Sequence, residues 1–346
     1  MNSITRNTLL GLMISAGAGI CGVAQASLTP SYQLSAAGAN LSTDGCGSNG
    51  PTCTLDSMLP TGATITQAYL YSSTYNPQTD PNGVMFSQGA ATTTPTFVAL
   101  GANNFGLQAW KANVTSFVQA NANLGSLTTW TANEGGNTSA IDGETLVIAY
   151  TDPSISAVQS VAILDGFSQT TGDTSSITFS ALPSGFSAAM QIGDGFSYDG
   201  ADPNNPDYTI GQVSTISVNG TTITTVAGHC DDDQTYPCAN GSLITMGAIN
   251  AGPDSDPFTP FPCNTTCIGS DHENYNLANV LGVGDTSAMI NTFNPSNNDN
   301  IFVETFEFSV AAHVVTGGVP EPGSLALFAS ALAGLGLFYR RRRARS

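Results

Sequence analysis

Short runs rich in β-branched and aromatic residues recur along the chain, and turn signals separate them. The clearest signal is Asn219-Gly220, which lies between two Thr/Ile/Val-rich runs and is typical of a two-residue β-hairpin. We expect strands at 65–75, 96–100, 127–131, 145–151, 158–164, 176–180, 208–218 and 221–226, and a long closing strand at 300–315. One short helix is expected at 114–122, and no long amphipathic helix is present. The predicted fold is therefore all-β, an antiparallel β-sandwich with long polar loops.

Residues 27–318 are long for a single sandwich but lie within the range of all-β domains. We favour one domain with a turn-rich insertion at 228–279. The alternative is a division near Asn204, inside the Pro/Asn/Asp-rich loop at 199–207.

The N-terminus has the pattern of a secretory signal peptide. Arg6 precedes an apolar run at 9–23 that ends in Ala24-Gln25-Ala26, with small residues where a signal peptidase requires them. We expect residues 1–26 to be removed after Ala26. The alternative, an uncleaved membrane helix, is disfavoured because the run is shorter than the ~20 residues that a span needs.

The C-terminus has three parts in a fixed order. Val319-Pro320-Glu321-Pro322 comes first, an apolar run at 324–339 follows, and Arg340-Arg341-Arg342-Arg343 closes it. As a helix, this run would span roughly 24 Å, somewhat less than a ~30 Å hydrocarbon core. The flanking arginines and Tyr339 can reach the interface to cover the difference. We predict a short transmembrane helix with the arginines in the cytoplasm and the body outside.

This tripartite tail resembles the PEP-CTERM sorting signal of exported Gram-negative proteins, and Pro320-Glu321-Pro322 matches the motif that gives the group its name. The resemblance implies export, transient anchoring in the inner membrane, recognition by exosortase, removal of the tail, and release or attachment at the cell surface. It also implies an association with exopolysaccharide and biofilm matrix. The alternative is an ordinary tail-anchored protein. The central region is not assigned to a family by this resemblance.

The charged residues are distributed very unevenly. Lys111 is the only lysine or arginine between residues 27 and 318, and the same segment holds 24 of the 25 acidic residues, which gives it a formal charge of -23. Binding to nucleic acid needs clustered cations, so that class of function is excluded. The acids must instead be solvated, dispersed or bound to cations.

Six cysteines remain after the signal peptide. In an exported chain we expect disulfides between sequence neighbours, and we disfavour zinc because the spacings lack the paired two-residue gaps of a structural site. The expected pairs are Cys46 with Cys53, Cys230 with Cys238, and Cys263 with Cys267.

No catalytic motif stands out. The chain has neither a nucleophile elbow nor a phosphate-binding loop, and Glu304 and Glu307, three residues apart on one expected strand, lie on opposite faces and cannot act as a pair. His313 fits a structural role in the closing strand. A metal site would form only if His229 with its neighbouring aspartates met the triplet Asp271-His272-Glu273. Calcium is a better match, with ligands expected at Asp194, Asp199, Asp202 and Asp207.

Two functions follow. The first is a non-enzymatic, exported surface or matrix protein with a structural or binding role, in which exposed tyrosines, Trp110 or Trp130 contact sugars. The alternative is a secreted polysaccharide-active hydrolase or lyase that uses Asp and Glu, with calcium. A cleft with two facing carboxylates would favour the second function.

Overall fold

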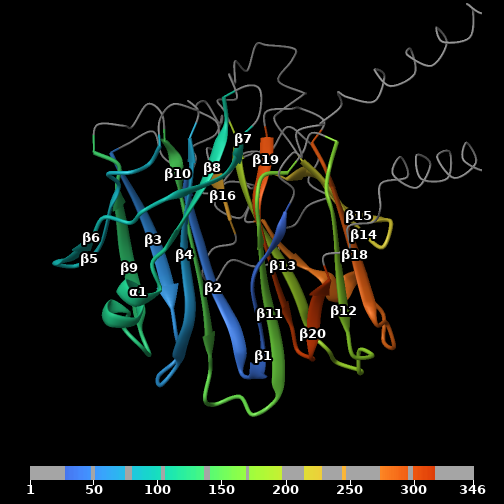
Figure 1. Cartoon of the computed structure of the whole chain (residues 1–346). Helices are drawn as coiled ribbons and strands as arrows, with labels where there is room; N and C mark the ends of the chain where they lie inside the picture. The colour runs from blue at the N-terminus through green and yellow to red at the C-terminus, as the bar shows by residue number, and fades with distance from the viewer. Residues whose placement is uncertain are drawn as a thin grey trace, which may run out of the picture.

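The computed structural model describes residues 28–47, 51–74, 80–102, 106–135, 141–168, 171–196, 214–227, 244–246, 273–294 and 299–315. Every strand pair in this part of the chain is antiparallel, and the strands form four sheets (Figure 1). The prediction of an all-β antiparallel sandwich is confirmed. We number the sheets I to IV in the order in which they stack.

Sheets I and II are built from the first half of the chain. Across sheet I the order is β3 (Thr52–Met58), β9 (Leu127–Asn133), β5 (Met85–Gln88) and β6 (Ala91–Thr93). Across sheet II it is β2 (Ala39–Gly47), β10 (Ile141–Thr151), β4 (Thr64–Thr74), β8 (Gln108–Asn113) and β7 (Val98–Ala102). The helix α1 (Thr115–Asn121) follows β8 and buries Val118.

Sheets III and IV come mainly from the second half. Across sheet III the order is β1 (Thr29–Ala37), β11 (Val158–Asp165), β19 (Asp299–Phe308), β13 (Ala188–Phe196) and β16 (Ile244–Thr245), and β17 (Asn274–Asn276) also pairs with β13. Across sheet IV it is β15 (Thr221–Ala227), β14 (Ser214–Val218), β18 (Ser287–Phe293), β12 (Thr174–Phe179) and β20 (Ala312–Val315). A 3₁₀ turn, η2 (Leu277–Asn279), follows β17.

Three hydrophobic cores separate the four layers. Successive side chains of a strand point to opposite faces. Leu146 and Ile148 of β10 therefore enter the core between sheets I and II, whereas Val147 and Ala149 enter the core between II and III. Strand β11 is shared in the same way between the middle core and the core between III and IV. Sheets II and III are thus covered on both faces, as Figure 1 shows edge-on from sheet I at left to sheet IV at right.

The expected helix and strands all overlap observed elements, but the closing strand differs in form. Ten further strands in the described part of the chain were not predicted, namely β1, β2, β3, β5, β6, β8, β13, β16, β17 and β18. Asn219 and Gly220 have φ of 50° and 80°, the positive values that a tight β-hairpin of type I′ requires, between β14 and β15. The expected single strand at 300–315 is instead two strands, β19 in sheet III and β20 in sheet IV. The chain leaves sheet III at Phe308 and enters sheet IV at Ala312. The two strands lie in facing sheets because Phe308 of β19 and Val314 of β20 both fill the core between sheets III and IV.

The predicted signal peptide, most of the insertion at 228–279 and the C-terminal tail lie outside the described residues. Within the part of the chain that the structure describes, no helix has the length and apolar character needed to cross a membrane.

Candidate binding site

A cavity of about 340 Å³ opens at one end of the layer between sheets II and III. Five strands contribute to it: the starts of β2, β11 and β13, the short strand β17, and the end of β19. Among the described residues, its polar lining consists of Asn40, Gln159, Ser187, Asn274, Asn276, Glu307 and Ser309. Amides and hydroxyls therefore dominate a site that is assembled from segments far apart in the sequence.

Strand alternation explains why Glu307 faces this cavity. Phe306 and Phe308 fill the core between sheets III and IV, so Glu307 points the other way, toward sheet II. Its Oε1 accepts a hydrogen bond of 2.7 Å from the backbone N–H of Leu41 in β2. Burial raises the pKa of Glu307 to about 7, although the Leu41 hydrogen bond acts in the opposite direction. The carboxyl group therefore exchanges its proton close to neutral pH.

The amides of the cavity are only partly used by the protein. Asn40 Oδ1 accepts from the backbone N–H of Leu41 at 3.0 Å, and Asn276 Oδ1 accepts from that of Ala278 at 3.0 Å. Gln159 Oε1 is buried and has no hydrogen-bond partner. A buried amide oxygen without a donor carries a desolvation cost, which a ligand donor would remove. The cavity thus offers donors from amide groups and at least one acceptor that lacks a partner.

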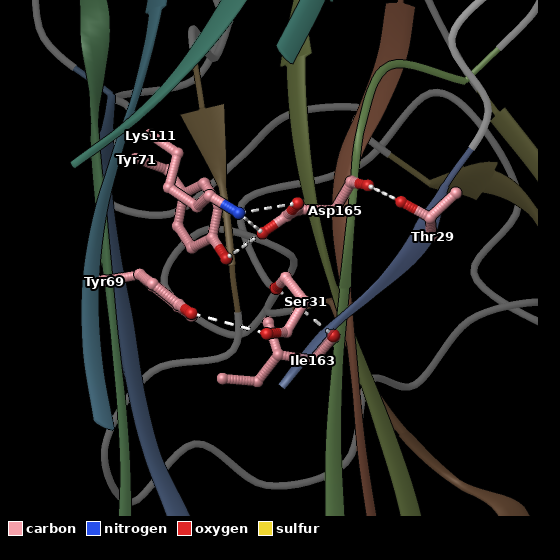
Figure 2. Close-up of polar contacts among 7 residues, drawn as sticks. All are labelled: Thr29, Ser31, Tyr69, Tyr71, Lys111, Ile163 and Asp165. Atoms are coloured by element: carbon pink, nitrogen blue, oxygen red, sulfur yellow. Dashed lines mark hydrogen bonds and ion pairs between the residues drawn. The ribbon is translucent and has the colours of Figure 1, made fainter. Parts of the chain in front are cut away.

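The body's single lysine is held at a different place in the same layer (Figure 2). Lys111 Nζ of β8 lies 2.9 and 2.7 Å from the two carboxylate oxygens of Asp165 in β11, and Tyr71 donates its hydroxyl to Asp165 Oδ2 at 2.9 Å. The ring of Tyr69 lies below the ammonium group, 4.9 Å from its centroid. Burial, then the charge of Asp165, raises the pKa of Tyr71 well above its usual range. This cation joins sheet II to sheet III and is already neutralised, so it does not serve as a binding group.

A third polar group lies at one end of the core between sheets I and II. Glu144 stands opposite Cys46 in the β2–β10 register, and Cys46 forms a disulfide with Cys53 of sheet I. Glu134, which follows β9, is 1% exposed, and neither of its carboxylate oxygens has a partner. Burial raises the pKa of Glu134 to about 8. Burial, with the charge of Glu134 as the next cause, raises the pKa values of Asp142 and Glu144 well above their usual range.

The structure describes some of the expected disulfide cysteines and calcium ligands, and others lie outside it. The Cys46–Cys53 disulfide is present, and Cys230, Cys238, Cys263 and Cys267 lie outside the described residues. Asp194 is fully buried within β13, and the other expected calcium ligands, Asp199, Asp202 and Asp207, lie outside the described part. Among the residues that the structure describes, no three His, Cys, Asp or Glu side chains are arranged to hold a metal ion.

The tryptophans, histidines and the remaining glutamate that the sequence singled out lie outside the cavity or outside the described residues. Trp130 is fully buried, and its indole N–H donates to Ser57 Oγ at 2.8 Å, while that of Trp110 donates to Thr74 Oγ1 at 3.0 Å. His313 is exposed on β20, and His229 and His272 lie outside the described residues. Glu304 accepts from Ser175 in the core between sheets III and IV, on the face opposite Glu307, as expected. Sequence reasoning missed the cavity because its amides follow no motif or period.

Comparison with known families identifies the tail. Residues 318–343 match the family model described as the PEP-CTERM protein-sorting motif. The chain carries a PEP-CTERM sorting signal. The match includes Val319-Pro320-Glu321-Pro322 and Arg340-Arg341-Arg342-Arg343, on which the resemblance was based. A PEP-CTERM signal marks an exported protein that is anchored transiently through its tail and sorted by exosortase.

The region upstream of the PEP-CTERM signal has only remote likenesses. No curated protein matches the chain. The crystal structure of BuGH86wt in complex with neoagarooctaose is 10% identical, at a TM-score of 0.25, over 85% of this chain and 35% of that chain. The chain therefore spans about a third of that protein's length. A peptide-N(4)-(N-acetyl-β-D-glucosaminyl) asparagine amidase is 11% identical, at a TM-score of 0.25, over 80% of this chain and 100% of the other. Likenesses at this TM-score support no inference about this chain.

Proposed function

We propose that this exosortase-sorted protein acts at the cell surface or in the extracellular matrix, where it has a non-enzymatic binding role associated with exopolysaccharide. The PEP-CTERM signal supports the location, since it marks an exported protein that is sorted by exosortase. The polar cavity between sheets II and III is the observation that carries the binding role. Pockets with a few convergent polar groups are the usual sites for small ligands.

The four-layer fold supports this proposal by holding the cavity rigidly. The walls come from strands of two adjacent sheets, and Glu307 of one sheet is hydrogen-bonded to the backbone of the other at Leu41. A site built on strands needs little ordering when a ligand binds, so less binding energy is lost.

A polysaccharide hydrolase is the second candidate, and one observation favours it. Glu307 lies in a cavity and has a pKa raised to about 7, which suits a general acid. Glycoside hydrolysis normally needs a second carboxyl group across the substrate. Glu307 is the only carboxyl group among the described residues that line the cavity, so we favour binding without turnover.

The sorting part is tested by replacing Pro320-Glu321-Pro322 with alanines in an exosortase-bearing host. We expect the variant to stay in the membrane fraction with its tail attached, while a Ser324→Ala control is processed normally. Unchanged processing and surface delivery of the triple variant would contradict the role of the motif.

The binding part is tested with processed protein recovered from the same host. We expect it to co-sediment with the exopolysaccharide of that host without releasing reducing ends. Release of reducing ends that is lost in Glu307→Gln would favour the hydrolase. Absence of both co-sedimentation and reducing-end release would remove the proposed binding role.

A further inference from the structure

We infer that the cavity between sheets II and III binds a neutral, hydroxyl-rich saccharide and discriminates against acidic sugars. The inference rests on the proposed binding function and adds the chemical class of the ligand. It depends on the hydrogen-bond inventory of the cavity, its electrostatics and its size.

The acceptors that line the cavity favour a ligand that donates hydrogen bonds. Gln159 Oε1 is a buried acceptor without a partner, and Glu307 adds a carboxyl group whose Oε1 receives only the Leu41 N–H. Sugar hydroxyls both donate and accept, so they can satisfy these acceptors and also receive the amide N–H groups of Asn40 and Asn276. A ligand carboxylate or sulfate only accepts and would leave Gln159 Oε1 unpaired.

Electrostatics disfavour an acidic ligand at the same place. The body has 24 acidic residues and one lysine, and that lysine is bound to Asp165. Glu307 places a negative charge in the cavity wall whenever it is ionised. Two like charges a few ångströms apart in a partly buried site repel strongly, and no lysine or arginine is found among the described residues of the lining.

The size of the cavity fits a short segment of sugar chain. Its volume of about 340 Å³ lies near the lower limit of the roughly 300–1,000 Å³ of ligand pockets, which is enough for one or two sugar rings. Phe308, the one aromatic residue among the described residues of the lining, is 3% exposed and belongs to the core between sheets III and IV. Binding therefore relies on hydrogen bonds, and we expect dissociation constants in roughly the millimolar range.

Matched pairs of oligosaccharides test the inference, because each pair differs only at the C6 groups. Galactotriose with trigalacturonate, and mannotriose with trimannuronate, are titrated against the processed full protein at pH 8 and low salt, with ligand-observed NMR as the readout. We expect a neutral member to bind at least tenfold more tightly than its uronate partner. Equal or tighter binding of the uronate would overturn the inference and leave the proposed polysaccharide-binding role intact.

Two variants assign the binding to this cavity. Gln159→Leu removes the unpartnered acceptor at similar volume and should weaken neutral-sugar binding at least tenfold without lowering the unfolding temperature. Glu307→Gln keeps an oxygen for Leu41 N–H and should narrow the gap between neutral and acidic sugars. Gln88→Leu, on β5 of sheet I, is the matched control and should change neither result.

Three further outcomes decide between the inference and the proposed function. Unchanged affinity in Gln159→Leu would place the ligand elsewhere and overturn the inference. If neither member of any pair binds while exopolysaccharide still co-sediments, the inference fails and the binding role stands. If both fail, the binding role itself is wrong.

Discussion

At the residue scale, the buried carboxyl groups beside the Cys46–Cys53 disulfide make stability depend on pH. The pKa of Glu134 is raised by burial to about 8, above the value near 4.5 of an exposed glutamate. Between these values the folded protein binds more protons than the unfolded chain, so the free energy of unfolding falls as pH rises. Asp142 and Glu144 act in the same direction, since their pKa values are also raised. The stabilisation that the bound proton of Glu134 gives is fully present below the unfolded-state pKa of about 4.5 and is lost above the folded-state pKa of about 8.

We predict that Glu134→Gln will flatten this dependence. The neutral amide needs no proton to remain buried, and the variant also removes a negative charge that acts on Asp142 and Glu144. Urea denaturation at pH 5, 7 and 9 should show wild-type stability falling with pH, and the variant falling less and exceeding wild type at pH 9. Asp80→Asn, at an exposed position, is the control and should follow the wild type. Parallel curves for Glu134→Gln and wild type would contradict the prediction.

A second prediction concerns the buried ion pair of Lys111 and Asp165 (Figure 2). Their side chains are 18% and 5% exposed, so removing one partner leaves a poorly solvated charge. Lys111→Met should therefore lower the free energy of unfolding by about 3 kcal/mol. Adding Asp165→Asn should restore most of that loss, because the unpaired charge is gone and Tyr71 keeps an oxygen acceptor.

Denaturant titration of both single variants and the double variant measures this coupling. Tyr71→Phe, which removes one donor but leaves the ion pair, should cost only about 1 kcal/mol. Additive effects of the two substitutions at Lys111 and Asp165 would show that the pair does not act as a unit.

At the element scale, the β14–β15 hairpin tests the backbone conformation that the sequence predicted. Gly220 has φ of 80°, and a Cβ added there would meet nothing within 4 Å. Gly220→Ala therefore probes conformation without a clash, and it should destabilise the protein by about 1–2 kcal/mol. Gly282→Ala is the matched control. The backbone of Gly282 lies outside the left-handed region, and a Cβ added there would meet Asp285 Oδ2 at an ordinary 3.7 Å. The substitution should therefore change the free energy of unfolding by no more than about 0.5 kcal/mol. Thermal unfolding of both variants distinguishes the two cases, and equal effects would exclude the conformational explanation.

Elements with a local signal were predictable, and those whose signal lies in their neighbours were not. The hairpin at Asn219-Gly220 and helix α1 follow from local sequence. Strand β13 contains Gly193 and Gly195, which weaken a strand in isolation. Gly193 is needed because a Cβ there would lie 2.5 Å from Val303 Cγ1 of the adjacent strand β19, and a Cβ on Gly195 would lie 2.6 Å from Ser73 Oγ of β4. The cavity could not be predicted from the sequence for a related reason. Asn40, Gln159 and Glu307 come together only after sheets II and III pack against each other.

At the scale of the whole molecule, the sequence indicates which strands are buried on both faces. A strand with one solvent-facing side alternates apolar and polar residues, whereas residues 146–150 of β10, Leu-Val-Ile-Ala-Tyr, are continuously apolar and buried. Residues 161–164 of β11 repeat this pattern. Both strands serve two cores at once, which turns the expected single sandwich into four stacked sheets. A run of this kind also fits a buried strand of an ordinary sandwich, so only the packing distinguishes the two arrangements.

The body as a whole carries 24 acidic residues against one lysine, and this imbalance predicts how salt acts on it. A body with this composition can form almost no ion pairs at its surface. Folding therefore brings like charges closer together, and their net electrostatic interaction is repulsive. Raising ionic strength from 0.01 to 0.15 M shortens the Debye length from about 30 to 8 Å and screens that repulsion. We therefore expect the unfolding temperature of the processed protein at pH 8 to rise by several degrees over this range. At pH 4, where many carboxyl groups are protonated, the same change should have a smaller effect. A salt-independent or falling unfolding temperature at pH 8, measured by calorimetry, would show that bound cations or local pairs already neutralise the acids.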